Sequence, residues 1–169
     1  MIIRLAQKQD LNELKEMYKK VVENMHKNGL EIWNEYYPCE VLADDIANQT
    51  LYILEENDEI LASCVLCPSE GEHEEKMGWK EQTKDALYVH RFAVNTKYLR
   101  QGTGSILLEK LREVSKEKGA KYLRLFAITL NENAIKFYTK NGFNKVEGIH
   151  PLDGDETSEL VEFGFEVEL

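Results

Sequence analysis

The stretch YLRQGTGSILLEKL, residues 98–111, decides how the middle of this chain folds. Gly102 and Gly104 flank one threonine, and a leucine-bearing pattern with helical spacing follows at once. Glycine inside a helix costs roughly 0.5–1 kcal/mol relative to alanine, so something should offset the two glycines. One interpretation is a phosphate group at the helix N-terminus, where free N–H groups and the helix dipole favour anions. The alternative is a tight strand-to-helix turn without a ligand.

The composition predicts one globular domain spanning residues 1–169, with 43% apolar and 31% charged residues. The formal net charge of −10 argues against nucleic-acid binding, which needs a basic surface, and favours a cationic substrate. No apolar run is long enough to cross a bilayer, so no membrane association is expected. The start MIIRLAQKQDL does not resemble a signal peptide, and a cytoplasmic location is therefore expected.

A disulfide scaffold is not expected, because the chain has only three cysteines and an odd number cannot all pair. They are Cys39, Cys64 and Cys67. Cys64 and Cys67 form a C-x-x-C pattern, but they lie in a stretch that is typical of a strand. Residues three apart in a strand point to opposite faces and lie roughly 10 Å apart, too far for a disulfide. We therefore expect buried strand thiols and no metal site.

The alternation of apolar patterns and turn residues predicts a layered, mixed α/β fold. Asp10 is expected to cap the first helix, with Glu13 completing a capping box. Residues 69–85 are polar and acidic, which predicts a long exposed loop or a ragged extension of a hairpin. Strands are expected at 2–6, 50–58, 59–68, 86–94, 121–128, 144–150 and 159–169. Helices are expected at 10–28, 38–48 and 104–118, and a fourth is opened by Asn131 or Asn133 and runs through Lys140.

Two common phosphate-binding loops do not fit the glycine stretch. A dinucleotide-binding G-x-G-x-x-G loop needs a glycine where Leu107 stands. A Walker loop needs G-x-x-x-x-G-K-[ST], which is absent. A G-x-G pattern alone is a weak indication of phosphate binding. Its position strengthens that indication, because it follows a strand and a short loop and directly precedes a helix.

The stretch FAVNTKYLRQGTGSILLEKL, residues 92–111, resembles the acyl-CoA-binding motif of the GNAT superfamily of N-acetyltransferases. Gly102 and Gly104 match its small positions. The stretch LNENAIKFYTKNGFNKVEGI, residues 130–149, resembles the second family signature, Asn-x-x-Ala-x-x-Phe-Tyr followed by Gly-Phe. The matching residues are Asn131, Ala134, Phe137, Tyr138, Gly142 and Phe143.

This resemblance implies a central mixed, mostly antiparallel sheet of about 6–7 strands flanked by about 4 helices. It also implies that acetyl-CoA is the acyl donor and that no metal takes part. Leu99 departs from the family pattern, which has Gln or Arg there. The implied cofactor-binding residues are Phe92, Ala93, Val94, Leu99, Arg100, Gln101, Gly102, Thr103, Gly104, Ser105, Asn131 and Asn133.

The resemblance assigns two catalytic residues. Tyr138 matches the general acid that protonates the departing coenzyme A thiolate, and its alternative is a tyrosine of the core. His90 stands where many relatives carry a glutamate base, and its imidazole suits removal of an ammonium proton. Alternation places His90 on one strand face with Tyr88, Phe92 and Val94, and its alternative is a hydrogen-bonded structural histidine. A backbone N–H near Val94 would act as the oxyanion donor.

The aromatic connector GLEIWNEYYP, residues 29–38, lies where the family places its acceptor-site loop. Trp33, Tyr36 and Tyr37 could surround the apolar part of an amine, and Glu31 or Glu35 could attract its charge. The alternative is that these aromatic side chains anchor the connector to the core.

The sequence therefore predicts a cytoplasmic N-acetyltransferase that transfers acetyl from acetyl-CoA to a primary amine of a small molecule or peptide. The rival prediction is a non-catalytic module that binds acyl-CoA as a sensor or scaffold. Polyamine-like molecules, amino acids, antibiotics and protein N-termini all stay open as acceptors. The resemblance also makes a homodimer through the C-terminal strands an expectation.

Overall fold

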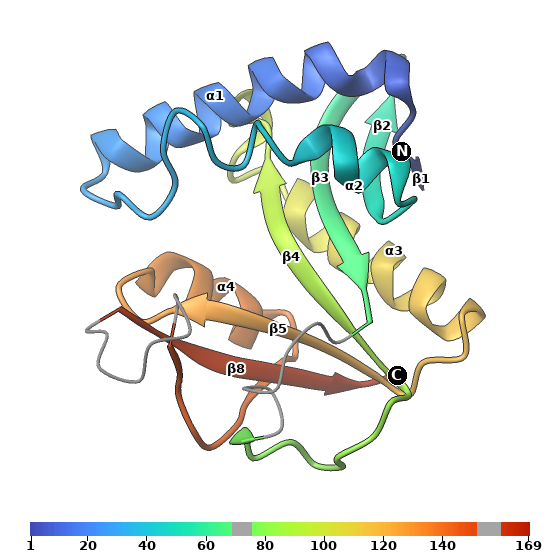
Figure 1. Cartoon of the computed structure of the whole chain (residues 1–169), viewed down its shortest axis with the longest axis vertical. Coiled ribbons are helices and arrows are strands. Elements are labelled where there is room, and N and C mark those ends of the chain that lie inside the picture. Colours follow the sequence, from blue (N-terminus) through green and yellow to red (C-terminus); the bar gives the residue numbers. More distant parts are fainter. Residues whose placement is uncertain (69–75, 152–159) are drawn as a thin grey trace. The chain divides into compact units, whose positions relative to one another are not determined.

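The computed structural model describes residues 1–68, 76–151 and 160–169 (Figure 1). Its α-helices are α1 (Leu11–Lys27), α2 (Leu42–Ala47), α3 (Thr103–Glu117) and α4 (Glu132–Lys140), and its short 3-10 helices are η1 (Lys8–Asp10) and η3 (Thr96–Tyr98). Its strands are β1 (Ile2–Leu5), β2 (Leu51–Glu56), β3 (Glu59–Cys67), β4 (Ala86–Val94), β5 (Tyr122–Ile128), β6 (Asn144–Lys145), β7 (His150–Pro151) and β8 (Val161–Glu168).

These strands form one sheet in the order β1-β2-β3-β4-β5-β8-β6, with β7 also paired to β8. Strands β4 and β5 run parallel, and α3 connects them, because parallel neighbours need a long crossover. The pairs β1–β2, β2–β3, β5–β8, β6–β8 and β7–β8 are antiparallel. The mixed, mostly antiparallel α/β fold is thus confirmed. The two-residue strands β6 and β7 raise the strand number above the expected 6–7 in the described ranges.

The chain divides into two compact units. The first unit holds residues 1–66 and 91–110, and the second holds residues 67–90 and 111–169. The chain therefore passes from one unit to the other within β3, within β4 and within α3. The single domain expected from the sequence stays a prediction.

Helix α1 provides much of the core of the first unit. Its buried side chains follow the 3.6-residue helical period, so they share one face: they are Leu14, Met17, Tyr18 and Val22. The predicted hairpin of β2 and β3 is confirmed, and its turn is made by Asn57 and Asp58, both with positive φ. Asn and Asp tolerate that conformation better than other residues with side chains, so the sequence favours a tight turn there.

Two local predictions in the first unit need correction. The second helix expected over 38–48 is present but starts later, since α2 covers Leu42–Ala47 and the residues ahead of it form two turns. The N–H groups of Glu40 and Val41 donate to the carbonyls of Tyr36 and Pro38. The expected capping box is wrong, although α1 does begin after Asp10.

The carboxylates expected in that capping box have stronger partners elsewhere. Asp10 accepts two hydrogen bonds from Arg4, at 2.7 and 3.1 Å, and a third from the N–H of Gln7. Glu13 accepts the N–H of Ile60 at 3.0 Å. The hydrogen bonds between Asp10 and Arg4 are charge-assisted and stronger than neutral ones. They explain why Asp10 does not form the capping box of α1. The Arg4 guanidinium also holds the pKa of Asp10 below its usual value.

Residues 69–75 of the expected exposed loop at 69–85 lie outside the described residues, and residues 76–85 are mostly exposed and form no regular helix or strand, as expected. Met77 and Trp79 are the exceptions, with only 2% and 6% of their surface exposed. They pack in a cluster with Ala86, Tyr88 and Tyr122. The sequence does not show the burial of Met77 and Trp79, because only these two apolar side chains stand among polar residues there, and one alternation is too short to indicate a strand. The predicted burial of Cys64 and Cys67 is confirmed.

Arg124 of β5 organises the second unit, although only 1% of its surface is exposed. Its Nε donates to Glu166 of β8 at 2.7 Å, and its Nη1 and Nη2 donate to the Tyr88 hydroxyl at 3.1 Å and the Glu81 carbonyl at 2.6 Å. The guanidinium also lies 4.6 Å from the ring centroid of Trp79. One buried cation thereby joins β4, β5, β8 and the 79–82 segment.

We expect Glu166→Gln to destabilise the protein strongly, because the substitution keeps the shape of the side chain but leaves Arg124 charged without its carboxylate. Removing one partner of a buried ion pair typically costs about 3–5 kcal/mol. Urea denaturation followed by near-ultraviolet circular dichroism measures the free energy of unfolding.

Glu132→Gln is the matched control, because it breaks an ion pair with Lys136 in the same unit whose side chains are 78% and 74% exposed. An exposed pair contributes far less than a buried one, because water and salt screen the attraction. Equal losses for the two variants would mean that the buried pair does not hold the second unit together.

Candidate active site

Strand β4 carries one catalytic candidate, His90, and pairs with β5 only over its first half. Its register with β5 runs from Ala86 to Val89, opposite Tyr122 to Leu125. His90 follows directly, half-buried, with its ring stacked 6.5 Å from that of Tyr88. The predicted shared face of His90 and Tyr88 therefore holds.

Arg91 breaks the strand alternation that the sequence predicts for Phe92 and Val94. Its φ is +48°, in the left-handed region. Ala93 is buried whereas Phe92 and Val94 are only half-buried, as the residues after an irregular strand position would be. Sequence reasoning missed this feature, because arginine carries no local preference for a left-handed backbone.

Two helices of the first unit hold Arg91. The Tyr18 hydroxyl of α1 donates to the Arg91 carbonyl at 2.6 Å and accepts from Ser63 at 2.9 Å. Asp45 of α2 accepts from the guanidinium at 2.9 and 2.6 Å. Burial raises the pKa of the Tyr18 phenol well above its usual value, so the hydroxyl stays protonated and can donate.

The loop after β4 leads into the glycine stretch. Asn95 caps η3 by accepting the N–H of Lys97 at 3.2 Å, and its Nδ2 donates to the carbonyl of Ile60 at 3.0 Å. Arg100 and Gly102 both have positive φ, +62° and +84°. Gly102 is needed for its backbone conformation and not for space, because a side-chain Cβ there would meet no atom within 4 Å.

Helix α3 begins at Thr103, one residue earlier than expected, and Gly104 lies buried in its first turn. The N–H of Ile106 donates to the Gly102 carbonyl, so the N–H groups of residues 103–105 precede the regular helical bonds. The hydroxyl of Thr103, one of the implied cofactor-binding residues, donates to the Tyr98 carbonyl at 3.2 Å. Ser105 is half-buried, while Leu99, Arg100 and Gln101 are exposed.

The second motif forms the start of α4 in the second unit. Asn131 caps this helix by accepting the N–H of Ala134 at 3.0 Å, which is a structural reason for an asparagine at that position. Asn133 is exposed in the first turn. Tyr138 is 8% exposed, and its ring lies 6.1 Å from those of both Phe143 and Phe165. Its ring is therefore part of the core, whatever its hydroxyl does.

The aromatic connector is attached to the first unit by two of its three aromatic side chains. Trp33 packs 5.9 Å from the ring of Tyr18 and 6.3 Å from that of Tyr37. The Tyr37 hydroxyl accepts from Arg91 at 3.4 Å. Tyr36 is 64% exposed, and Glu31 is exposed as well. Trp33 and Tyr37 thus anchor the connector, and the acceptor-binding role of Trp33, Tyr36, Tyr37 and Glu31 stays a prediction.

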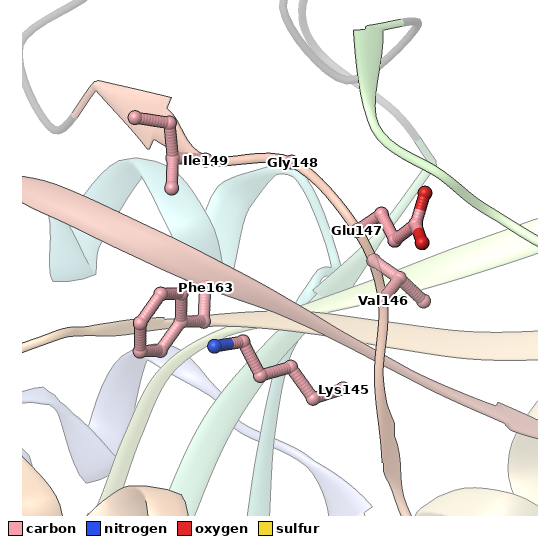
Figure 2. A pocket seen from close by; sticks show the side chains of 6 residues that line it. All are labelled: Lys145, Val146, Glu147, Gly148, Ile149 and Phe163. Carbon is pink, nitrogen blue, oxygen red and sulfur yellow. The ribbon is translucent and has the colours of Figure 1, made fainter.

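A shallow pocket of about 520 Å³ lies in the second unit, and none of the predicted site residues lines it. Figure 2 shows its lining, with the Lys145 ammonium over the ring of Phe163, 3.1 Å from the centroid. The other lining residues are Val146, Glu147, Gly148 and Ile149. Among the described residues, no group of three histidine, cysteine or acidic side chains is placed to hold a metal ion. No helix in the same ranges is both long and apolar enough for a membrane span.

Known proteins resemble this chain over most of its length. A solved acetyltransferase structure of the GNAT family from Streptococcus agalactiae matches with a TM-score of 0.86 and 20% identity, covering 99% of this chain and 95% of that one. Ribosomal-protein-alanine N-acetyltransferase from Brucella melitensis matches with a TM-score of 0.73 and 21% identity, covering 100% of both chains. The ribosomal-protein-S18-alanine N-acetyltransferase from Escherichia coli matches with a TM-score of 0.67 and 18% identity, covering 99% of this chain and 92% of that one. At these identities the matches show a shared fold.

The family itself is shown by sequence. The sequence model of the acetyltransferase (GNAT) family matches residues 11–143, which include the aromatic connector, β4, the glycine stretch and α4. Because this match covers well over half of the 169 residues, the chain belongs to the GNAT family of acetyltransferases.

Proposed function

We propose that this protein transfers the acetyl group of acetyl-CoA to a primary amine of a small molecule or peptide by direct attack of the amine on the thioester. The family uses acetyl-CoA as donor and acts on amine acceptors. The observation that carries the proposal is the left-handed Gly102 directly before α3. Its backbone conformation turns the chain into α3 so that the first N–H groups of the helix stay free of regular helical bonds, which suits a pyrophosphate.

In the proposed reaction, the amine gives up a proton, and its lone pair then attacks the thioester carbonyl carbon. The backbone N–H near Val94 stabilises the developing oxyanion. The C–S bond breaks, Tyr138 protonates the coenzyme A thiolate, and the proton that the newly acylated nitrogen then loses restores the Tyr138 phenol. His90 takes the proton of the acceptor ammonium. The roles of the N–H near Val94, of Tyr138 and of His90 rest on the family resemblance of these three residues.

Two observations bear on which amines the protein acetylates, and both are less direct than the family match. A net charge of −10 favours a cationic amine, since long-range attraction raises its local concentration. Two structural relatives are named as ribosomal-protein-alanine N-acetyltransferases, so peptides with N-terminal alanine belong among the candidates. We also propose, as expected from the sequence, that the protein is cytoplasmic and forms a homodimer.

An amine panel tests the proposed function. Purified protein and acetyl-CoA are incubated with polyamines, amino acids, aminoglycosides and an alanine-terminated peptide, while a thiol reagent follows the release of coenzyme A. We expect amine-dependent thiol release, with the acetylated product identified by mass spectrometry. Calorimetric binding of acetyl-CoA without turnover on any amine supports the non-catalytic rival instead. Absence of binding contradicts both.

Gly102→Ala should weaken acetyl-CoA binding about tenfold, or roughly 1.4 kcal/mol, because alanine disfavours the left-handed backbone that aims the N–H groups. The dissociation constant is measured by isothermal titration calorimetry on protein whose fold is checked by circular dichroism.

Gly119→Ala provides the matched control just past the other end of α3. Gly119 has φ +81° and, like Gly102, no atom within 4 Å of the position that a Cβ would take, so both variants lose stability for the same backbone reason. Only Gly102 lies in the proposed phosphate loop. If both variants keep the wild-type affinity, the loop is a turn and not a phosphate site.

Tyr138→Phe should lower kcat roughly 10–100-fold, because it removes the proposed acid and keeps the ring. A free thiol has a pKa of about 8.5 by analogy with cysteine, so its thiolate leaves tolerably without help. We therefore expect the low end of the usual range for acid catalysis. Acetyl-CoA affinity should change by no more than about threefold, because the interaction belongs to the transition state.

Tyr122→Phe controls for the loss of a phenol elsewhere in the second unit, where Tyr122 is 2% exposed. This control should retain the wild-type kcat, even where its melting temperature falls. Tyr138→Phe with normal kcat and a lowered melting temperature would place Tyr138 in the core only.

A further inference from the structure

Arg91 has a backbone conformation that its amino-acid type does not favour. Among the described residues, the other non-glycine positions with positive φ are Gln49, Asn57, Asp58 and Arg100. All of these lie outside regular strands and helices, whereas Arg91 lies inside β4. A left-handed residue with a side chain costs roughly 1–2 kcal/mol, so surrounding contacts must stabilise it. Such residues concentrate at functional sites.

The contacts that stabilise Arg91 act on both its main chain and its side chain. The fully buried Tyr18 fixes the carbonyl with a 2.6 Å hydrogen bond. Asp45 fixes the guanidinium through two bonds, and the two side chains are only 18% and 11% exposed. A two-pronged, largely desolvated pair of this kind fixes direction as well as distance. Arg91 is therefore held from α1 at one end and from α2 at the other.

The held residue stands where β4 stops pairing with β5 and the proposed acyl-binding stretch begins. The β4–β5 register ends at Val89, and Phe92, Ala93 and Val94 follow Arg91. Past this stretch, the N–H of Asn95 donates to the Leu61 carbonyl at 2.9 Å, which fixes its far end. The φ of Arg91 consequently sets the direction in which the N–H groups of residues 92–94 point.

We propose that Tyr18 and Asp45 are positioning residues for acetyl transfer, which they support by holding Arg91 in its left-handed conformation. This proposal rests on the proposed function. The two residues do not touch the acyl donor in this scheme. They keep the strand backbone aimed so that its N–H group can stabilise the oxyanion without reorganisation. The Tyr37 hydroxyl, 3.4 Å from Arg91, extends the same network to the aromatic connector.

Asp45→Asn tests the proposal, with Asp10→Asn as its matched control. Both substitutions remove the charge of a carboxylate that binds an arginine through two hydrogen bonds within the first unit. The two carboxylates have similarly small exposed fractions, 11% and 9%. We expect both variants to lose melting temperature. Only Asp45→Asn should lower kcat, by about tenfold, while its dissociation constant for acetyl-CoA stays within about threefold.

Tyr18→Phe provides a second, independent variant, since it removes one hydroxyl and keeps the ring that packs on Trp33. It should lower kcat in the same sense as Asp45→Asn. Equal kcat for Asp45→Asn, Tyr18→Phe and Asp10→Asn at matched folded fractions would overturn the proposal.

A readout without turnover separates this proposal from the proposed function. In amide NMR spectra, Asp45→Asn should shift the backbone signals of Phe92, Ala93 and Val94, and Asp10→Asn should leave them in place. If the wild-type protein acetylates no amine, the proposed function fails, whatever these signals do. If the wild-type protein is active and the three signals do not move in Asp45→Asn, the positioning proposal fails alone.

Discussion

The left-handed backbone of Arg91 is the constraint on which the first unit depends. Strand β4 pairs with β5 up to Val89. Its residues up to His90 belong to the second unit, and those from Arg91 onward belong to the first. A regular strand would continue its alternation through this point. The bond from Tyr18 and the pair with Asp45 fix the change of direction, and so α1, α2 and the end of β4 have one geometry relative to each other within that unit. The aromatic connector joins this arrangement through Tyr37.

Each unit thus contains one arginine that carboxylate and phenol groups hold in place. In the first unit Arg91 pairs with Asp45, and in the second Arg124 pairs with Glu166. Both arginines also bind a tyrosine hydroxyl. Burying such pairs returns little net stability, because desolvation opposes the attraction. Their value lies in geometry, since a planar guanidinium accepts partners only in fixed directions.

The sequence predicts the regular elements well where the chemistry is local. Strand β4 has the expected bounds, because its alternating apolar residues need no distant partner to be recognised. Helices α3 and α4 begin within two residues of expectation, since glycine and asparagine mark helix ends by their own conformational preferences. The second helix starts later than expected because the residues before it form turns, and the capping box is wrong because Asp10 pairs with Arg4.

The candidate site also has a part that is visible in the sequence and a part that is not. The glycine stretch and the cap at Asn131 are visible in the sequence, because they are local devices. Arg91 is not, because its partners Asp45 and Tyr18 are 46 and 73 positions away in the chain. No spacing rule relates residues that meet only after folding. The roles of His90 and Tyr138 in catalysis stay predictions, although the structure shows where both rings pack.

The buried arginine of the second unit has a consequence for how the protein is made. Glu166, which holds Arg124, also accepts the N–H of Lys80, yet the ribosome adds Glu166 86 positions after Lys80. At synthesis rates of about 5–20 residues per second, that separation lasts on the order of ten seconds. Throughout this interval Met77 and Trp79 have been synthesised without the strand that completes their surroundings. Until β8 is synthesised, the nascent chain cannot enclose these two apolar side chains as the folded chain does.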